Sequence, residues 1–309
     1  MRILMVGAGG VGGYFGGRLA AAGDDVTFIA RGAHLAAMRS QGLRIESPLG
    51  DVRIEPVQAA ETAGGLNPVD VVFIAVKIGD TDAAIAACRE AVGPDTVVIS
   101  LQNGLAADDA LIAAFGAERV AGGVAYIASQ VAKPGVIQHI GANQRIQVGE
   151  LAGGISARCE AIAARLCAAG IDGEAAPDIT RAMWDKFSFL VALAGLTSVT
   201  GEPIGVIRAD PDMRALLHEV MKETVAVGRA RRVDFPADYA DQRLAFADTL
   251  PEDMRSSMYH DLVAGKPLEL DWLTGAVVKM GKAEGIPTPA NAAIYAGLKT
   301  RRLGAHTPS

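Results

Sequence analysis

A glycine-rich turn near the N-terminus has the spacing of a phosphate-binding loop. It follows an apolar run, residues 3–6, leads into a stretch with helical character, and consists of Gly7, Ala8, Gly9, Gly10, Val11 and Gly12. In this order Gly7 allows a tight turn, Gly9 lets the backbone approach a pyrophosphate, and Gly12 lets the helix pack closely on the strand. The helix N-terminus then presents unpaired N–H groups to the phosphates. The pattern predicts a dinucleotide-binding site.

Arg31 stands at the end of the next apolar run, residues 26–30. NAD sites usually carry Asp or Glu here, where the carboxylate binds the adenosine ribose. A guanidinium instead forms a fork that pairs with a 2′-phosphate. Arg31 therefore predicts NADPH rather than NADH as the cofactor, and an exposed surface arginine is the alternative interpretation.

Two further polar residues follow predicted strands. Lys77 comes after residues 71–76, and Asn103, in an Asn-Gly pair, comes after residues 97–101. Ligands of open α/β sheets bind at the carboxyl ends of strands, so Lys77 is expected beside Arg31 and Asn103 near the nicotinamide or the substrate. A solvated loop lysine and a plain turn are the alternatives.

Three candidates lie in the second half of the chain. Lys186 is the last charged residue before fifteen uncharged ones, and a lysine at the edge of a buried helix can act as a general acid when desolvation lowers its pKa. Glu269, two residues after a proline, and the pair Ser256-Ser257 also fit ordinary helix starts. From the residues alone, the structural interpretations are favoured for all three.

The elements that must position these residues follow two patterns. Up to about residue 177, apolar strand-like runs (3–6, 26–30, 71–76, 97–101 and 120–127) alternate with helical runs such as 81–91 and 106–115. This alternation predicts a parallel sheet covered on both faces. A hairpin is expected at 43–46 and 52–55, an antiparallel edge from 136–140 and 145–148, and a helix at 155–169.

After residue 177 the predicted elements are helices: 179–200, 210–231, 236–247, 268–283 and 289–302. Leu270, Leu273, Val277 and Met280 recur on one helical face. The predicted fold is therefore α/β, a Rossmann-type doubly wound sheet that binds NADP (residues 1–177) followed by an all-helical domain for substrate and catalysis (residues 178–309).

Composition excludes several classes of function. The 309 residues are 50% hydrophobic with a net charge of −6, which argues against nucleic-acid and anionic-membrane partners. No apolar stretch reaches a membrane-spanning length, and the three cysteines are expected to be buried thiols in a reducing compartment, so we expect a cytoplasmic protein. The five histidines show no metal-binding spacing. The long apolar helix after Lys186 fits either a core or a homodimer interface.

These motifs, taken together, resemble the ketopantoate reductase (2-dehydropantoate 2-reductase) family almost from end to end. The resemblance rests on the glycine turn, Arg31, Val76-Lys77, Asn103-Gly104, Trp184 to Phe187, Ser256 to Met258 and Glu269 to Asp271. It implies a two-domain fold with the active site in a cleft. It also implies NADPH-dependent reduction of a 2-oxo acid to a 2-hydroxy acid in pantothenate biosynthesis.

The resemblance also implies residue roles. Lys186 would protonate the carbonyl oxygen as hydride arrives at the carbon, and Asn103 would touch both nicotinamide and substrate. Arg31 and Lys77 would hold the 2′-phosphate, and Ala128, after the strand ending at Ile127, would contact the cofactor through its backbone. Ser257 would bind the substrate, and Glu269 would bind the cofactor ribose and help to orient Lys186.

The chain departs from the family pattern on the substrate side. Typical members carry asparagines one and two helical turns after the lysine, where this chain has Leu190 and Ala194. A further asparagine position is Ile204, unless Thr200 or Glu202 takes its place. An apolar site binds hydroxyls poorly, so a more apolar 2-oxo acid is the alternative substrate, as in a related D-2-hydroxy acid dehydrogenase. A non-catalytic NADPH sensor is the alternative from another class of protein.

Overall fold

The computed structural model describes residues 1–304 and divides into two compact units, Met1–Met183 and the chain from Trp184 onward. The boundary falls inside helix α6 (Ile179–Thr200). The expected boundary near residue 177 lies in the loop just before this helix.

The first unit is built on a ten-stranded sheet in the order β4-β3-β9-β8-β7-β6-β1-β2-β5, with β10 beside β9. Its strands are β1 (Arg2–Val6), β2 (Asp25–Ile29), β3 (Leu43–Glu46), β4 (Val52–Ile54), β5 (Gln58–Ala60), β6 (Val71–Ile74), β7 (Val97–Ser100), β8 (Val120–Lys133), β9 (Val136–Gly149) and β10 (Asp172–Ala175). All pairings from β5 to β8 are parallel. The strand order reverses between β1 and β6, which is the switch point where open α/β sheets bind ligands.

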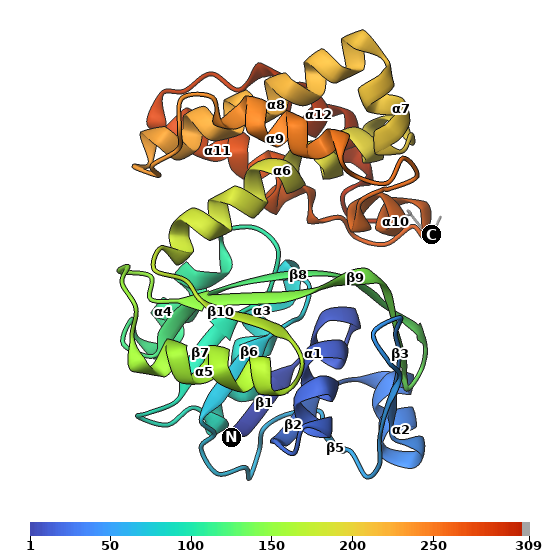
Figure 1. Cartoon of the computed structure of the whole chain (residues 1–309), viewed down its shortest axis with the longest axis vertical. Helices are drawn as coiled ribbons and strands as arrows, with labels where there is room; N and C mark the ends of the chain where they lie inside the picture. The colour runs from blue at the N-terminus through green and yellow to red at the C-terminus, as the bar shows by residue number, and fades with distance from the viewer. Residues whose placement is uncertain (305–309) are drawn as a thin grey trace. The chain divides into compact units, whose positions relative to one another are not determined.

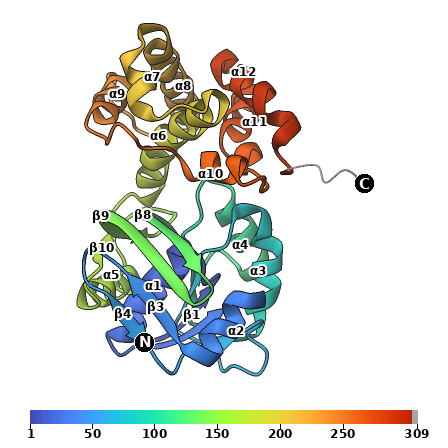
Figure 2. The same cartoon turned by 90° about the vertical axis from the view of Figure 1, so that its right-hand side faces the viewer.

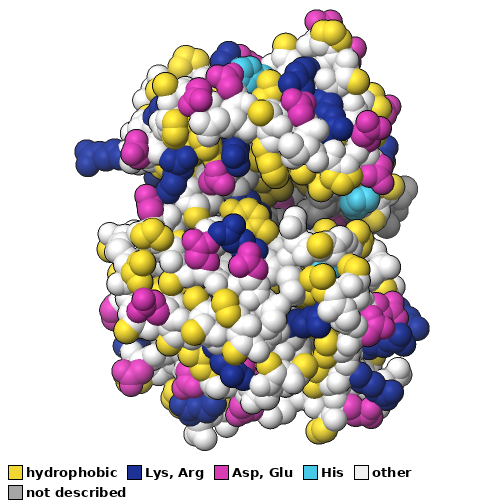
Figure 3. Space-filling model, viewed as in Figure 1, with side chains coloured by type: hydrophobic (Ala, Val, Ile, Leu, Met, Phe, Trp, Pro, Cys, Tyr) yellow, Lys and Arg dark blue, Asp and Glu magenta, His cyan; other side chains and the backbone are white. Residues whose placement is uncertain are grey.

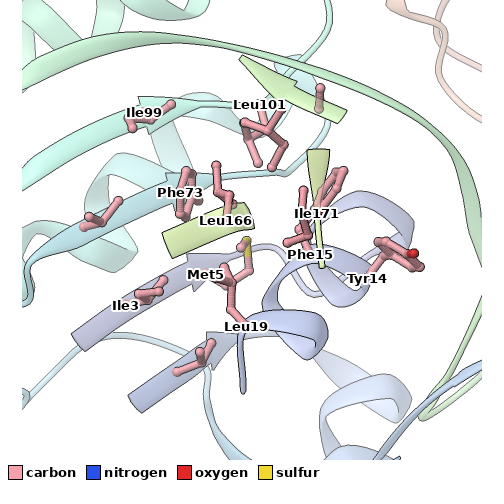
Figure 4. Close-up of a cluster of buried hydrophobic side chains, with 14 of the residues drawn as sticks. Ile3, Met5, Tyr14, Phe15, Leu19, Phe73, Ile99, Leu101, Leu166 and Ile171 are labelled. Atoms are coloured by element: carbon pink, nitrogen blue, oxygen red, sulfur yellow. The ribbon is translucent and has the colours of Figure 1, made fainter. Parts of the chain in front are cut away.

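Helices cover both faces of the parallel strands, as the alternating pattern predicts (Figures 1 and 2). They are α1 (Gly10–Ala21), α2 (Gly32–Gln41), α3 (Thr81–Cys88), α4 (Ala107–Phe115) and α5 (Ala157–Ala168), with short 3₁₀ turns η1 (Ile78–Asp80) and η2 (Arg89–Ala91). Successive residues of β1 enter different cores. Ile3 and Met5 pack with residues of α1 and α5 (Figure 4), whereas Leu4 and Val6 pack with residues of α3 and α4. The N-terminus of α1 is thereby held beside the end of β1.

The β8–β9 region differs from the prediction. The segments 136–140 and 145–148 belong to one strand, β9, which pairs antiparallel with β8 but is not an edge, because β3 and β10 also pair with it. Strand β8 does not end at Ile127 but continues through a bulge to Lys133. Residues 128–133, the outer part of β8, are mostly exposed, so they lack the apolar run that marks a buried strand. The expected hairpin of β3 and β4 is confirmed.

The described part of the second unit consists of helices joined by loops. Beyond α6 it contains α7 (Ile204–Ala209), α8 (Pro211–Ala230), α9 (Tyr239–Asp248), α10 (Ser257–Val263), η3 (Glu269–Trp272), α11 (Thr274–Glu284), α12 (Pro289–Leu298) and η4 (Lys299–Arg301). The helix expected at 268–283 is divided, because Leu273 (φ −107°, ψ −101°) interrupts it between η3 and α11. Leu270, Leu273 and Val277 are nevertheless buried as predicted.

Helix α6 is long and apolar enough to cross a membrane by length and composition alone. However, 61% of its most apolar window is buried inside the protein, as in the core helix of a soluble protein. Charged side chains of both signs are dispersed over the face shown in Figure 3, where no broad basic patch is seen. Cys88 and Cys159 are buried thiols as expected, but Cys167 is exposed at the end of α5, where its Sγ atom faces the Gly173 carbonyl oxygen at 3.1 Å.

Candidate functional site

The glycine turn has the geometry that its sequence predicts. Gly7 has φ +98°, a conformation that other residues rarely adopt, and a Cβ atom on Gly12 would overlap the Gly7 carbonyl oxygen. In contrast, a Cβ on Gly9 would meet no atom within 4 Å, so the turn is open on that side. Helix α1 begins directly after Gly9 and has neither a side-chain N-cap bond nor an acidic residue in its first turn. The turn therefore offers backbone N–H groups and room for a phosphate.

Arg31 and Lys77 lie just beyond β2 and β6, the two strands that flank β1. Arg31 is exposed, and its guanidinium approaches the Asp80 carboxylate at 3.4 Å. Asp80 ends the short turn that Lys77 begins. The loops after β2 and β6 therefore meet beside the glycine turn, and two cations and one carboxylate gather there.

Asn103 is half-buried in the loop after β7, and Gly104 takes the left-handed conformation (φ +94°). The preceding residue ties this loop to the one after β6, because the Gln102 amide nitrogen bonds the Thr81 hydroxyl at 3.0 Å and the Lys77 carbonyl at 3.3 Å. The carboxyl ends of β1, β2, β6 and β7 thus bring the glycine turn, Arg31, Lys77 and Asn103 to one edge of the sheet. Ala128 lies within β8 at the bulge after Ile127, and not at a strand end as expected.

Lys186 lies in the third turn of α6. Desolvation by burial lowers the pKa of its ammonium group to about 8, and the nearby Glu269 carboxylate opposes this by raising the pKa. Glu269 is itself buried, at the start of η3. The adjacent carboxylate, Asp185, pairs with Arg243 at 3.3 Å. Within the second unit the fold therefore places Glu269 near a half-buried lysine whose pKa is lowered to about 8, and such a group suits proton transfer.

The two serines at α10 have different roles. Ser256 is the buried N-cap, whose hydroxyl accepts a bond from the Tyr259 N–H at 3.1 Å and contacts the Thr197 hydroxyl at 2.9 Å. Ser257 is the first residue of the helix and is exposed. The cap interpretation therefore holds for Ser256, and the Ser257 side chain remains available for a ligand.

The positions where the family resemblance calls for amides are apolar in the fold as well. Leu190 and Ala194 follow Lys186 at intervals of four residues along α6 and so share its helical face. Ala194 and Ile204 are fully buried. Among residues 1–304 no cluster of three or more His, Cys, Asp or Glu side chains could hold a metal ion.

Comparison with known proteins decides the family. A 2-dehydropantoate 2-reductase from Mesorhizobium japonicum is 33% identical over 317 residues, covering 96% of each chain. Residues 3–153 match the family model described as ketopantoate reductase PanE/ApbA, and residues 178–302 match its C-terminal counterpart. The chain belongs to the ketopantoate reductase family. It is an oxidoreductase, as the sequence resemblance predicts.

Solved structures agree with this assignment. The crystal structure of 2-dehydropantoate 2-reductase from Geobacter metallireducens superposes with a TM-score of 0.91 at 32% identity, covering 97% of this chain and 99% of the other. A D-mandelate dehydrogenase structure with NADH and anilino(oxo)acetate has a TM-score of 0.89 over 98% of each chain. Because that protein is only 19% identical, it shows the shared fold alone.

Sequence reasoning missed three residues at the sheet edge: Asp80, Gln102 and His34. Asp80 stands three residues after Lys77 on the same loop, so the sequence offered a signal for it. Gln102 directly precedes Asn103, and no motif marks it. No spacing rule indicates His34, because its contacts join segments that are up to 101 residues apart.

Proposed function

We propose that this chain reduces ketopantoate to pantoate with NADPH as hydride donor, the step that the family serves in pantothenate biosynthesis. The observation that carries the proposal is the half-buried Lys186, whose ammonium group is desolvated to a pKa of about 8, near the Glu269 carboxylate in a chain of this family. A fully exposed lysine would stay hydrated, and its pKa would not be lowered by desolvation.

The first unit fits the proposed cofactor. The open side of Gly9 and the uncapped N-terminus of α1 would take the pyrophosphate. Arg31 and Lys77 would take the 2′-phosphate, for which Arg31 must exchange Asp80 for the incoming anion. Asn103 and the Ala128 backbone would contact the cofactor from the loop after β7 and from β8.

In the reaction, NADPH when bound supplies a hydride to the substrate carbonyl carbon. Lys186 donates a proton to the carbonyl oxygen at the same time, so that the alkoxide charge does not build up and a 2-hydroxy acid forms. Glu269 keeps the lysine protonated at neutral pH by raising its pKa against the effect of burial. Ser257 and Asn103 would hold the substrate through hydrogen bonds.

Substitution of Lys186 tests the proposal. We expect Lys186→Ala to lower kcat by roughly 10²–10⁴-fold, the usual contribution of a general acid, while NADP⁺ binding stays intact. Lys279→Ala, at an exposed lysine of α11, is the matched control and should retain full activity. A Lys186→Ala enzyme with most of its kcat would refute the general-acid role.

One observation favours a second candidate substrate. Leu190 and Ala194, on the same face of α6 as Lys186, offer no hydrogen bond to a substrate hydroxyl. A reductase with this face would favour a 2-oxo acid with an apolar or aromatic side chain. The third candidate, a sensor that binds NADPH without turnover, would keep its function after Lys186→Ala.

A further inference from the structure

His34, on helix α2, links two segments that are remote in sequence. One imidazole nitrogen, Nε2, lies 2.8 Å from the carbonyl oxygen of Ala8 in the glycine turn. The other, Nδ1, accepts a hydrogen bond from the backbone N–H of Gly135 at 3.1 Å. Gly135 forms the tip of the β8–β9 hairpin, and its carbonyl accepts a bond from the Arg44 N–H at 2.9 Å.

These two contacts define the protonation state of the ring. The Ala8 carbonyl can only accept, so Nε2 must carry a hydrogen, and the Gly135 N–H can only donate, so Nδ1 must be bare. His34 is therefore the neutral Nε2–H tautomer. A second proton would place an Nδ1–H group against the Gly135 N–H and break that bond.

The same hairpin packs directly on the first turns of α1. A Cβ atom on Gly10 would overlap the Ser129 carbonyl oxygen in β8, and a Cβ on Gly13 would lie 2.7 Å from Cδ1 of Ile137 in β9. The hairpin is thus one wall of the glycine turn. His34 is the side chain that ties the tip of this wall to the turn itself.

We propose that neutral His34 is a positioning residue for the dinucleotide, because it fixes the glycine turn against the β8–β9 hairpin in the conformation that binds NADP⁺. The proposal rests on the cofactor role given above to the glycine turn. It predicts that affinity for NADP⁺ falls when the link is cut or when His34 is protonated.

The surroundings of the imidazole favour the neutral form. Burial lowers the pKa of His34 below its ordinary value of 6.5, and the bond to the Ala8 carbonyl only partly opposes this. The glycine turn carries no charged residue. The charged side chains on the other adjoining segments are Arg31 directly before α2, Arg39 on α2, Lys133 and Arg145 on the hairpin, and Arg44 and Glu46 on β3. Arg44 engages the one carboxylate, Glu46, at 3.4 Å. Protonation is therefore expected only below about pH 6.5.

The test measures the Kd for NADP⁺ by calorimetry at pH 7.5 and pH 5.5. At pH 7.5 we expect His34→Ala to raise the Kd by roughly 10-fold, as the loss of one to two net hydrogen bonds implies. His34→Gln should stay within about 3-fold of the wild type, because its carboxamide can donate to Ala8 and accept from Gly135. Acidification should raise the Kd of the wild type more than that of His34→Gln, and titration of the 2′-phosphate cancels in this comparison.

His139 supplies the matched control. It is also a buried histidine of the first unit whose pKa burial lowers, and its ring packs on Tyr14 of α1. Its nitrogens contact the Ser47 hydroxyl at 2.9 Å and the Asn143 carbonyl at 3.0 Å, so they do not bond the glycine turn. His139→Ala should lower the melting temperature without raising the Kd. If His34→Ala loses only thermal stability, or if both variants weaken binding equally, the proposal is wrong.

Two outcomes separate this proposal from the proposed function. A wild-type protein that does not bind NADP⁺ would overturn the cofactor role and this inference together. A wild type that binds NADP⁺ with the same pH dependence as His34→Gln would overturn the role of His34 alone. This second comparison uses folded proteins, so it remains decisive if His34→Ala fails to fold.

Discussion

Two opposing influences set the pKa of Lys186, and they predict the pH dependence of the enzyme. The protonated lysine is the active acid, so kcat/KM should fall as the pH rises through about 8. Removal of the Glu269 charge leaves the desolvation unopposed, so Glu269→Gln should move this alkaline limb to lower pH. Asp185→Asn, which removes a carboxylate that pairs with Arg243, should leave the limb in place. Profiles that coincide for Glu269→Gln and wild type would contradict this coupling.

Arg31 predicts the choice of cofactor. Because a guanidinium pairs with a 2′-phosphate in a charge-assisted fork, we expect Arg31→Ala to lower kcat/KM for NADPH by about 10- to 100-fold and to change that for NADH little. Arg39→Ala, on helix α2 directly after Arg31 but bonded to the Ala59 carbonyl at 2.9 Å, is the control. An unchanged preference for NADPH over NADH in the Arg31 variant would show that the phosphate lies elsewhere.

The site residues differ in how well the sequence could reveal them. The glycine turn carries its function in a local pattern, because the strand, the glycines and the helix are contiguous. Lys186 carries no such local pattern, because its neighbours in the sequence predict a surface lysine. Its desolvation and its interaction with Glu269 arise from tertiary packing, since the two residues are 83 positions apart in the sequence. Only the family resemblance pointed to that pair.

At the level of elements, two glycines of the turn should respond differently to the same substitution. Gly12→Ala places a Cβ atom into the Gly7 carbonyl oxygen, so we expect a loss of stability of about 1–3 kcal/mol or more. Gly9→Ala meets open space at an ordinary φ of −68°, so the melting temperature should change little. The Gly9 variant should nevertheless bind NADP⁺ more weakly, because its methyl group occupies the room for the pyrophosphate.

Thermal melts and titrations with NADP⁺ separate these effects. A Gly9→Ala protein that binds NADP⁺ as the wild type does would mean that the pyrophosphate does not approach the turn on this side. A Gly12→Ala protein of unchanged stability would mean that the helix can move away from the strand.

Whole elements were predicted correctly where burial produced a continuous or periodic run of apolar residues. Strands β6 and β7 are buried along their whole length and β1 from its second residue onward, and α6 begins and ends at the predicted residues. The exposed outer half of β8 and the short strands β5 and β10 lack such a pattern, because their pairing partners, rather than their own side chains, determine them. The predicted helix at 268–283 failed at Leu273, where the backbone break is not encoded by a proline or a glycine.

On the scale of the whole molecule, the two halves of the chain constrain the function unequally. The glycine turn, Arg31 and Lys77 are the residues that we propose for the NADPH site. The face of α6 that carries Lys186 continues with Leu190 and Ala194, so the substrate is the less constrained partner of the reaction. The family assignment establishes an oxidoreductase, and the substrate must be measured.

The most direct measurement is the oxidation of NADPH by the purified protein, followed by absorbance, with ketopantoate and a panel of apolar and aromatic 2-oxo acids. We expect turnover with kcat/KM for ketopantoate well above that for every other acid. A higher kcat/KM for an apolar or aromatic 2-oxo acid would contradict the ketopantoate assignment and make Leu190 and Ala194 the first positions to exchange. Absence of NADPH oxidation with every acid would contradict the reductase proposal itself.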